Sequence, residues 1–432
     1  MMRKATYVVL LGLILLFHSC QSQDKRMAER EQLEIFEQVW NHVNEQFHDG
    51  EFNGVDWERM HSEYRPAIAA CTNRDSLFLL LNRMLFELNS SHCGVGMLSE
   101  MGKVLSPYLF SPAEIGLDIR ILDHQIVVTD VSANSSAAHA GIKTGFILER
   151  IDGLTLSEIE KRVRYKPPFN DRNRTFHLTG EVLRRIYGKP NTTVTVEFTD
   201  EAMQSHSRTI ARTERKDAVS LGGGLPPAYL YSFSTQCTET IGYLRFNAFR
   251  PSDMEHVLKD YDEIAVSKGL IIDVRGNDGG SVEGMKRLCG RFVSRRMKFG
   301  SYINRHEQND DSIVPVGDTY QGSVVLLVDE MSISGAENMA GIFQQLNIGK
   351  VIGRRTPGQM LWGDGYLVHD SIALSIPIYR LEYVNGFNPE DNGITPDIEV
   401  ELNREDLLRG KDTQLETALE FLEHELSKSQ RK

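Results

Sequence analysis

One segment in the last third of the chain constrains the fold more than any other. Residues 324–329 form an almost unbroken apolar run rich in valine, which predicts a strand covered on both faces. Three small residues, Ser334, Gly335 and Ala336, then let the backbone turn sharply before a helical pattern begins at Glu337. A serine at such a corner lies at the positive end of a helix dipole, beside N–H groups that can hold an oxyanion. The corner therefore indicates a nucleophile, although many α/β units without catalysis are built the same way.

The chain after Thr213 alternates between apolar runs and amphipathic stretches. Such alternation predicts a largely parallel sheet covered by helices, which is an α/β core. The expected strands cover residues 241–246, 269–275 and 323–328, and the expected helices cover 252–267, 284–295 and a closing stretch from 412.

A glycine-rich turn follows the strand expected at 269–275. Its paired glycines, Gly279 and Gly280, leave backbone N–H groups able to point at a ligand, although a Gly-Gly pair alone is more often a plain turn. The carboxyl ends of neighbouring parallel strands meet at one edge of a sheet, so this turn is expected to lie beside Ser334. Gly335, together with Gly279 or Gly280, is then the candidate oxyanion hole.

Two regions precede the core. Residues 20–106 combine a polar tether with helices whose apolar residues recur every three or four positions, and we interpret Trp40 and Trp57 as packing residues. Residues 107–212 are β-rich, with one short helix expected at 135–141. The stretch 160–180 is basic with little apolar period, which favours a mobile surface insertion.

Charge and cysteine usage exclude several classes of function. The net charge is -12, and loss of the first 19 residues with Arg3 and Lys4 takes it to about -14, which argues against nucleic-acid binding. Besides Cys20 there are four scattered cysteines without CxxC spacing, so neither a metal site nor a disulfide scaffold is indicated. A single disulfide stays open. No cofactor motif is present, and none is expected.

The first residues have the layout of an export signal. Arg3 and Lys4 precede the apolar stretch 5–17, which is short for a membrane span, and Cys20 follows at once. This resembles a bacterial lipoprotein signal, which implies removal of residues 1–19, acylation of Cys20 and attachment to the cell envelope at the periplasmic face or outer membrane. The alternative is an uncleaved anchor or an ordinary secretory signal, and both export the remainder.

The β-rich region 107–212 resembles a PDZ domain. The residues that carry the likeness are a loop, a helix-to-strand turn and a strand with its turn, at Ile115-Gly116-Leu117, 136–145 and 147–153. The resemblance implies that an extended peptide adds to a sheet edge while N–H groups near Gly116 receive its terminal carboxylate. Alternatively, the module only braces its neighbours.

Together these regions resemble the C-terminal processing peptidase and tricorn protease family of serine peptidases. The likeness covers nearly the whole chain after the leader and rests on four motifs in the family's order, at 273–280, 332–337, 353–358 and 392–397. It implies a crotonase-like α/β core at 213–432, with Ser334 as the nucleophile.

The same resemblance distinguishes two choices of general base. In the processing peptidases a lysine follows the Thr-x-Gly element, but this chain has Gln359 there, and an amide cannot accept and return a proton. In the tricorn-like branch the base is a histidine that follows a serine, which here implies His92 oriented by Ser91. That branch also uses a glutamate, here Glu390, to hold the serine hydroxyl.

The sequence therefore predicts an exported, lipid-anchored serine endopeptidase that acts on a peptide or protein substrate without a metal. Two other interpretations stay open. One is a binding lipoprotein for peptides or hydrophobic ligands that keeps the fold without catalysis, and the other is a peptide-binding scaffold acting through the PDZ-like region. Substrate preference and oligomeric state are not predicted.

Overall fold

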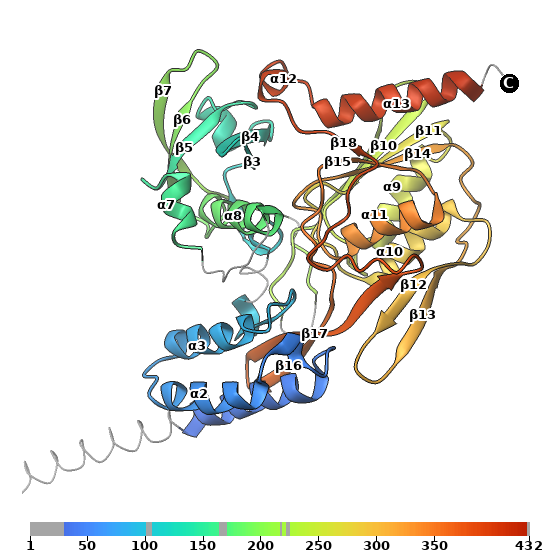
Figure 1. Cartoon of the computed structure of the whole chain (residues 1–432). Coiled ribbons are helices and arrows are strands. Elements are labelled where there is room, and N and C mark those ends of the chain that lie inside the picture. The colour runs from blue at the N-terminus through green and yellow to red at the C-terminus, as the bar shows by residue number, and fades with distance from the viewer. Residues whose placement is uncertain (1–29, 101–105, 164–170, 217, 222–224, 430–432) are drawn as a thin grey trace, which may run out of the picture. The chain divides into compact units, whose positions relative to one another are not determined.

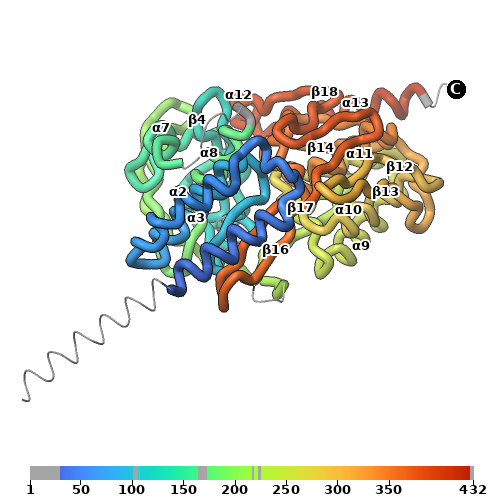
Figure 2. The backbone as a smooth tube through the Cα atoms, turned by 60° about the horizontal axis from the view of Figure 1, so that its bottom comes forward, coloured from blue at the N-terminus to red at the C-terminus, as the bar shows by residue number. Residues whose placement is uncertain are grey.

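The structure is a computed structural model that describes residues 30–100, 106–163, 171–216, 218–221 and 225–429. The leader and Cys20 lie outside these residues. The chain divides into two compact units. Figures 1 and 2 colour the described residues by their number along the chain. Unit 1 comprises Met1–Met97 and Gly363–Ile378, and unit 2 comprises Leu98–Trp362 and Tyr379–Lys432.

Unit 1 contains the predicted N-terminal helices. They cover residues 30–46, α2 (Trp57–Ala69) and α3 (Arg74–Phe86), with a short 3-10 turn η1 (Phe52–Gly54) between the first two. Asp56 and Asn73 begin α2 and α3 by accepting a backbone N–H with their side chains. Trp57 is buried and Trp40 packs beside it, which confirms that both are packing residues.

Strands from late in the sequence complete unit 1. β1 (Gly94–Met97) pairs antiparallel with the first residues of β17 (Ile372–Tyr383), which also pairs with β16 (Trp362–His369). Leu374 and Ile376 of β17 are fully buried among the helices' apolar side chains. The second half of β17 belongs to unit 2, where it pairs with β12 (Met297–Ile303), and β12 forms a hairpin with β13 (Gln308–Ile313).

The β-rich part of unit 2, which we call the middle module, spans the residues between α5 (Pro107–Phe110) and β8 (Thr213–Glu214). Its antiparallel sheet has the order β3-β4-β5-β6-β7, so β3 is an edge strand. The strands are β3 (Leu117–Leu122), β4 (Gln125–Val131), β5 (Ile147–Ile151), β6 (Thr193–Thr199) and β7 (Ser205–Ala211), and β2 (Ala113–Glu114) pairs separately with β8. Helices α6 (Ser136–His139), α7 (Leu156–Glu160) and α8 (Asp171–Ile186) complete the module.

The expectation of a mobile insertion at 160–180 is wrong for its second half. Residues from Asp171 onward form α8, and Leu178, Val182 and Ile186 of that helix are buried in the core of the module. The apolar period becomes regular only after residue 175, so the basic residues before it conceal the helix. Residues 164–170 lie outside the described residues.

The α/β core contains the predicted parallel sheet. Its order is β18-β15-β14-β11-β10-β9, and every neighbouring pair is parallel except β9 with β10. The strands are β9 (Ser232–Gln236), β10 (Ile241–Phe246), β11 (Gly269–Asp273), β14 (Ser323–Val328), β15 (Lys350–Gly353) and β18 (Ile398–Glu399). The mixed α/β fold class is confirmed.

Helices cover both faces of this sheet (Figure 1). On β14, Val324, Leu326 and Val328 face a core shared with α9 (Met254–Ile264), α10 (Val282–Cys289) and α11 (Gly335–Leu346). The alternate residues Val325 and Leu327 face the closing helix α13 (Thr413–Ser429). Two short helices, η2 (Gly290–Phe292) and α12 (Arg404–Leu408), follow α10 and precede α13. The unbroken apolar run of β14 is thus explained by burial on two faces.

Within the described residues, no helix combines the length and the apolar character needed to cross a membrane. The thiols of Cys71, Cys93, Cys237 and Cys289 are all free.

Candidate active site

Ser334 stands at a strained corner between β14 and α11. Its backbone has φ 54° and ψ -112°, a conformation that non-glycine residues rarely adopt and that occurs preferentially at functional sites. Ser334 is half-buried, whereas Gly335 through Phe343 behind it are buried without exception. The corner therefore presents one hydroxyl at the N-terminus of a helix that is itself fixed in the core.

The carboxylate of Glu337 holds this corner from within. Its Oε2 accepts the N–H of Ser334 at 3.1 Å and that of Gln359 at 2.8 Å. Its Oε1 accepts the Thr356 hydroxyl and the Gly358 N–H, both at 2.6 Å. Burial raises the pKa of Glu337 to about 7, although these four hydrogen bonds act to lower it. The buried carboxylate thus ties the serine corner to the turn at 356–359.

The Gly279-Gly280 turn packs directly against the serine corner. Gly279 has φ 71°, and a Cβ there would lie 2.6 Å from the Gly335 nitrogen and 2.7 Å from the Ser334 Cβ. A Cβ on Gly335 would lie 3.3 Å from the Gly280 nitrogen. Gly279 therefore needs glycine, because a side chain there would separate the two turns, whereas one on Gly335 would require its neighbours to shift by a few tenths of an ångström.

The backbone donors of this turn are not equivalent. The Gly279 N–H donates to Asn277 Oδ1 at 2.9 Å, and the Asn277 side chain is itself fixed by the Phe246 carbonyl. Among the hydrogen bonds of the described residues, none uses the N–H of Gly280 or of Gly335. These two amides are therefore the better pair of oxyanion donors.

The turn that follows Thr356 contacts two further residues singled out in the sequence, Gln359 and Glu390. The backbone carbonyl of Gln359 accepts the Ser334 N–H at 3.1 Å, while its side-chain amide donates to Asn173 Oδ1 at 3.4 Å. Glu390 is anchored at the two residues that follow Gln359, because its Oε2 accepts the N–H groups of Met360 and Leu361 at 2.7 and 3.1 Å.

His92 and Ser91 lie together in unit 1, between α3 and β1. Ser91 Oγ is 2.9 Å from His92 Nδ1, and Ser91 is buried. His92 has φ 59°, and its backbone carbonyl accepts the hydroxyl of Ser375 on β17 at 2.8 Å. Burial lowers the pKa of His92 to about 4, so its imidazole is neutral at neutral pH. The neighbouring Cys93 thiol has a pKa raised to about 12 by burial, which keeps it protonated and inert.

Comparison with known proteins agrees with these features. Residues 240–400 match the family model for peptidase family S41, and residues 28–86 match the model for the tricorn protease C1 domain. The chain is 22% identical over 406 residues to the tricorn protease of Thermoplasma acidophilum, a match covering 91% of this chain and 35% of that protein. It is also 22% identical over 407 residues to the carboxyl-terminal-processing protease of Synechocystis sp., covering 92% of this chain and 88% of that protein. The chain belongs to the S41 family of serine peptidases.

The fold of this S41 peptidase has counterparts among solved structures. The structure of mature CPAF complexed with lactacystin aligns with a TM-score of 0.61 at 13% identity, covering 92% of this chain and 98% of that one. The chain spans about a third of the length of the first curated relatives that it matches.

The structure groups the predicted site residues of this S41 peptidase in three places. Ser334 and Gly335 lie against Gly279 and Gly280, and Glu390 is anchored on the turn that also contacts the Ser334 N–H. Ser91 and His92 form a pair in unit 1. The third group, the loop at Ile115, Gly116 and Leu117, lies in the middle module.

That loop begins the edge strand β3. Ile115 and Leu117 are buried, and Gly116 has φ 77° with no room for a Cβ, which would lie 2.3 Å from the Ser135 Cβ. The carbonyls of Ile115 and Gly116 accept the N–H groups of Ala137 and Ser132, both at 2.9 Å. The loop is thus fixed by α6 and the segment before it.

Sequence reasoning missed the residues that hold the site rather than act in it. Asn277, Thr356 and the bracing role of Glu337 were not predicted, although Glu337 and Thr356 stand inside the motifs that suggested the family. Glu337 has a signal, because it is a charged residue among the small and apolar residues at the start of α11, which marks a buried hydrogen-bond partner. Asn277 and Thr356 have polar neighbours in the sequence and carry no such signal. Within the described residues, no cluster of three or more His, Cys, Asp or Glu side chains is placed to hold a metal ion.

Proposed function

We propose that this S41 peptidase hydrolyses internal peptide bonds of a peptide or protein with Ser334 as the nucleophile. One observation carries the proposal. The hydroxyl of Ser334 is presented at a strained corner of a buried helix, directly beside the Gly280 and Gly335 amides. Donors placed where charge develops are worth about 10²- to 10³-fold in rate each in acyl-transfer enzymes.

His92 is the general base in this proposal. With its Nδ1–H donated to Ser91 Oγ, the Nε2 lone pair accepts the proton of the Ser334 hydroxyl as Oγ attacks the scissile carbonyl carbon. The carbonyl oxygen becomes an oxyanion that the Gly280 and Gly335 amides bind. Collapse breaks the C–N bond, and the imidazolium returns its proton to the leaving amine.

Deacylation reverses the roles. His92 removes a proton from a water molecule, whose oxygen attacks the acyl carbon, and the proton then returns to Ser334 Oγ as the carboxylate product leaves. The lowered pKa keeps the imidazole unprotonated at the start of each step, but it also weakens the affinity of Nε2 for the proton it must accept.

Ser91 and Glu390 are positioning residues in this scheme. Ser91 fixes the imidazole ring through the 2.9 Å contact with Nδ1, and we assign Glu390 to hold the Ser91 hydroxyl. The anchoring of the Glu390 carboxylate by two backbone amides is consistent with that role. Gln359 contributes its backbone carbonyl, and its amide side chain performs no proton transfer.

The middle module is assigned to substrate capture. An extended peptide would add to a sheet edge of this module, with its terminal carboxylate at the backbone N–H groups near Gly116. The Ser334→Ala full chain is expected to bind a peptide with a free C-terminus and to bind the same peptide poorly once it is amidated. Equal affinity for both, measured by fluorescence anisotropy, would refute carboxylate capture.

The protein is also proposed to be exported and held at the cell envelope by a lipid on Cys20. A Cys20→Ala chain should leave the membrane fraction, and mass spectrometry of the native chain should find an acylated Cys20 at its N-terminus. An unmodified Cys20 inside an intact leader would support the uncleaved anchor instead.

Labelling with a fluorophosphonate probe tests the central assignment. The native chain should be labelled and should cleave a casein-type substrate, whereas Ser334→Ala should lose both properties. Ser323→Ala removes a hydroxyl from the opposite end of β14 and serves as the matched control, which should behave as the native chain.

Two outcomes would contradict the proposal. Full labelling and hydrolysis by Ser334→Ala would remove this serine from the mechanism. A folded native chain that is neither labelled nor active on any peptide, yet binds peptides or apolar ligands, would establish the binding lipoprotein.

A further inference from the structure

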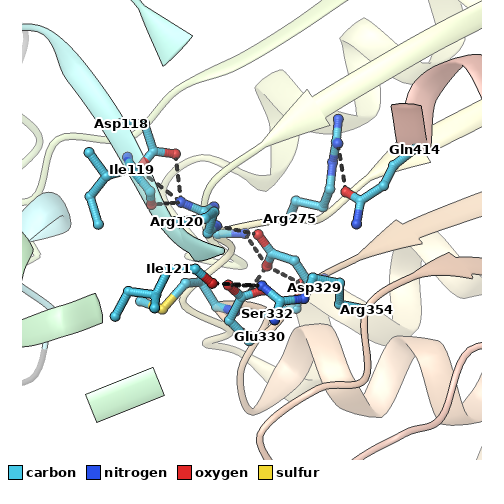
Figure 3. Close-up of polar contacts among 12 residues, drawn as sticks. Asp118, Ile119, Arg120, Ile121, Arg275, Asp329, Glu330, Ser332, Arg354 and Gln414 are labelled. Atoms are coloured by element: carbon cyan, nitrogen blue, oxygen red, sulfur yellow. Dashed lines mark hydrogen bonds and ion pairs between the residues drawn. The ribbon is translucent and has the colours of Figure 1, made fainter. Parts of the chain in front are cut away.

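A buried arginine of the middle module, Arg120, reaches from β3 into the α/β core (Figure 3). Only 4% of this residue is exposed. Its Nε donates to Asp329 Oδ2 at 2.7 Å, and its Nη1 donates to both carboxylate oxygens of Asp118 at 2.9 Å and to the Ile119 carbonyl at 2.7 Å. Nothing in the mechanism above uses this residue.

The partner carboxylate, Asp329, joins the two loops of the candidate site. Its Oδ1 accepts the Gly276 N–H at 3.0 Å, at the start of the oxyanion loop 276–280. The same oxygen accepts the Met331 N–H at 3.0 Å and the Ser332 hydroxyl at 3.2 Å, in the turn that leads to Ser334. One carboxylate therefore bonds both the oxyanion loop and the nucleophile turn, in addition to the direct bond from the Ile333 N–H to the Asn277 carbonyl at 3.0 Å.

Arg120 also touches the oxyanion loop itself. Gly276 has φ 69°, and a Cβ there would lie 3.1 Å from Arg120 Nη2. Burial alone would raise the pKa of Asp329, but the Arg120 charge and the Gly276 N–H keep it below its usual value. The carboxylate accordingly stays ionised and can keep all of its donors.

The middle of the same loop is tied toward the module as well. Asp278 accepts the hydroxyls of Ser106 and Tyr108, which lie just before and within α5, and the Arg250 guanidinium at 3.1 Å. The loop that carries Gly279 and Gly280 is thus bonded through two carboxylates, Asp329 at its start and Asp278 at its middle. Both of these carboxylates take donors from residues at or inside the middle module.

We infer that Arg120 is a positioning residue for hydrolysis: the middle module supplies, through this side chain, the charge that fixes Asp329 and with it the oxyanion loop against Ser334. The inference deepens the proposed function and rests on Ser334 being the nucleophile. Arg120 touches no reacting atom, so its loss should lower kcat by misplacing the Gly280 donor while KM for a short peptide changes little.

A second ion pair at the same boundary supplies the matched control. Arg354 donates to Glu330 Oε1 at 2.6 Å and lies 3.5 Å from the Ile121 carbonyl of β3, but it bonds neither the oxyanion loop nor residues 331–334. If Arg120 only attached the module to the core, Arg354→Met would have the same effect as Arg120→Met.

The experiment measures kcat and KM for a short chromogenic peptide, together with the rate of fluorophosphonate labelling and the thermal midpoint. Arg120→Met is expected to lower kcat and the labelling rate by about 10- to 100-fold with KM within about threefold of native. Arg120→Lys keeps the charge but not the fork of donors, and should recover only part of the loss. Arg354→Met should retain native kcat.

The inference is overturned if Arg120→Met keeps kcat within about twofold, or if Arg354→Met loses as much. Where Arg120→Met does not fold, a folded Arg120→Lys chain with native kcat overturns it equally. Ser334→Ala in parallel separates the two proposals, because activity that survives Ser334→Ala defeats the proposed function, whereas normal Arg120 variants beside an inactive Ser334→Ala defeat only this inference.

Discussion

Ser334 and His92 share an unusual backbone conformation but are held by different means. Both are non-glycine residues with positive φ, at 54° and 59°. Ser334 is braced from inside the core by Glu337, whose carboxylate takes four hydrogen bonds, and by glycines packed against it. His92 is held instead by two hydroxyl groups. Ser91 Oγ contacts its Nδ1, and the Ser375 hydroxyl donates to its backbone carbonyl.

This difference separates two ways of storing strain at a site. At the serine corner the surrounding core over-determines the backbone, so the strained residue has no alternative. At the histidine the support is a few contacts in a short connection that begins at Asn89, another residue with positive φ. We expect the nucleophile to be sensitive to added volume and the base to be sensitive to lost hydrogen bonds.

The largest expected effect comes from removing the base. His92→Ala should lower kcat by roughly 10²- to 10⁴-fold, because no other group would take the Ser334 proton. Gln359→Ala is the control, since it removes the side chain at the position of the lysine in the processing peptidases while keeping the backbone carbonyl. Steady-state hydrolysis of a peptide decides the matter, and a Gln359 variant more damaged than the His92 variant would reject the tricorn-like assignment.

Added volume at the serine corner should have the next largest effect. Gly279→Ala places a methyl group 2.6 Å from the Gly335 nitrogen, and it should lower kcat about 100-fold by separating the two turns. Gly141→Ala is matched in backbone conformation, with φ 84°, but its methyl group enters open space.

Both variants share the strain of a left-handed alanine, about 1 kcal/mol of unfolding free energy. Measuring kcat and the free energy of unfolding for both variants therefore separates the effect of backbone strain from the effect of the methyl group pressing against Gly335. Equal activity in the two variants would show that close packing at Gly279 is unimportant for catalysis.

The sequence revealed the serine corner more fully than the histidine loop for a physical reason. The corner is built from neighbours in sequence, with Glu337 three residues after Ser334, and its frame is an apolar strand followed by a helix. The resemblance supplied His92 and Ser91, but their support includes β17, which is about 280 residues away. No local pattern predicts that strand pairing.

The same reasoning explains what else was missed. Arg120 alternates with apolar residues in β3, so the sequence pattern predicts an exposed side chain at this position. Its partner Asp329 is 209 residues away, so only the folded chain reveals the pair. Helix α8 was missed because its apolar period begins late.

Removal of the hydroxyl that orients the imidazole should have a smaller effect than removal of the base. Ser91→Ala leaves His92 Nδ1 without its 2.9 Å partner, and kcat should fall about 10-fold as the ring samples other orientations. Ser90→Ala removes the neighbouring hydroxyl and should leave kcat unchanged. A Ser91→Ala chain with native kcat would show that the histidine is oriented by its backbone contacts alone.

The smallest effect concerns the pH dependence of stability, because the pKa values of His92 and Glu337 are shifted in opposite directions. The pKa of His92 falls from 6.5 to about 4, so the unfolded chain takes up a proton first as pH falls. Stability present above pH 6.5 should therefore be lost between about pH 6.5 and 4. The pKa of Glu337 rises from 4.5 to about 7, so its contribution is complete below pH 4.5 and is lost as pH rises through about 7.

Thermal midpoints between pH 4 and 8 test both signs. His92→Gln should flatten the acid side of the profile, and Glu337→Gln should flatten the alkaline side. His177→Gln is the control for the acid side, because burial lowers the pKa of His177 to about 4 as well. Catalysis should follow His92 alone, with an acid limb near pH 4 instead of pH 6.5, since the imidazole must be neutral to accept the serine proton. A limb near pH 6.5 would mean that the imidazole is hydrated when it acts, and that burial does not set its pKa during catalysis.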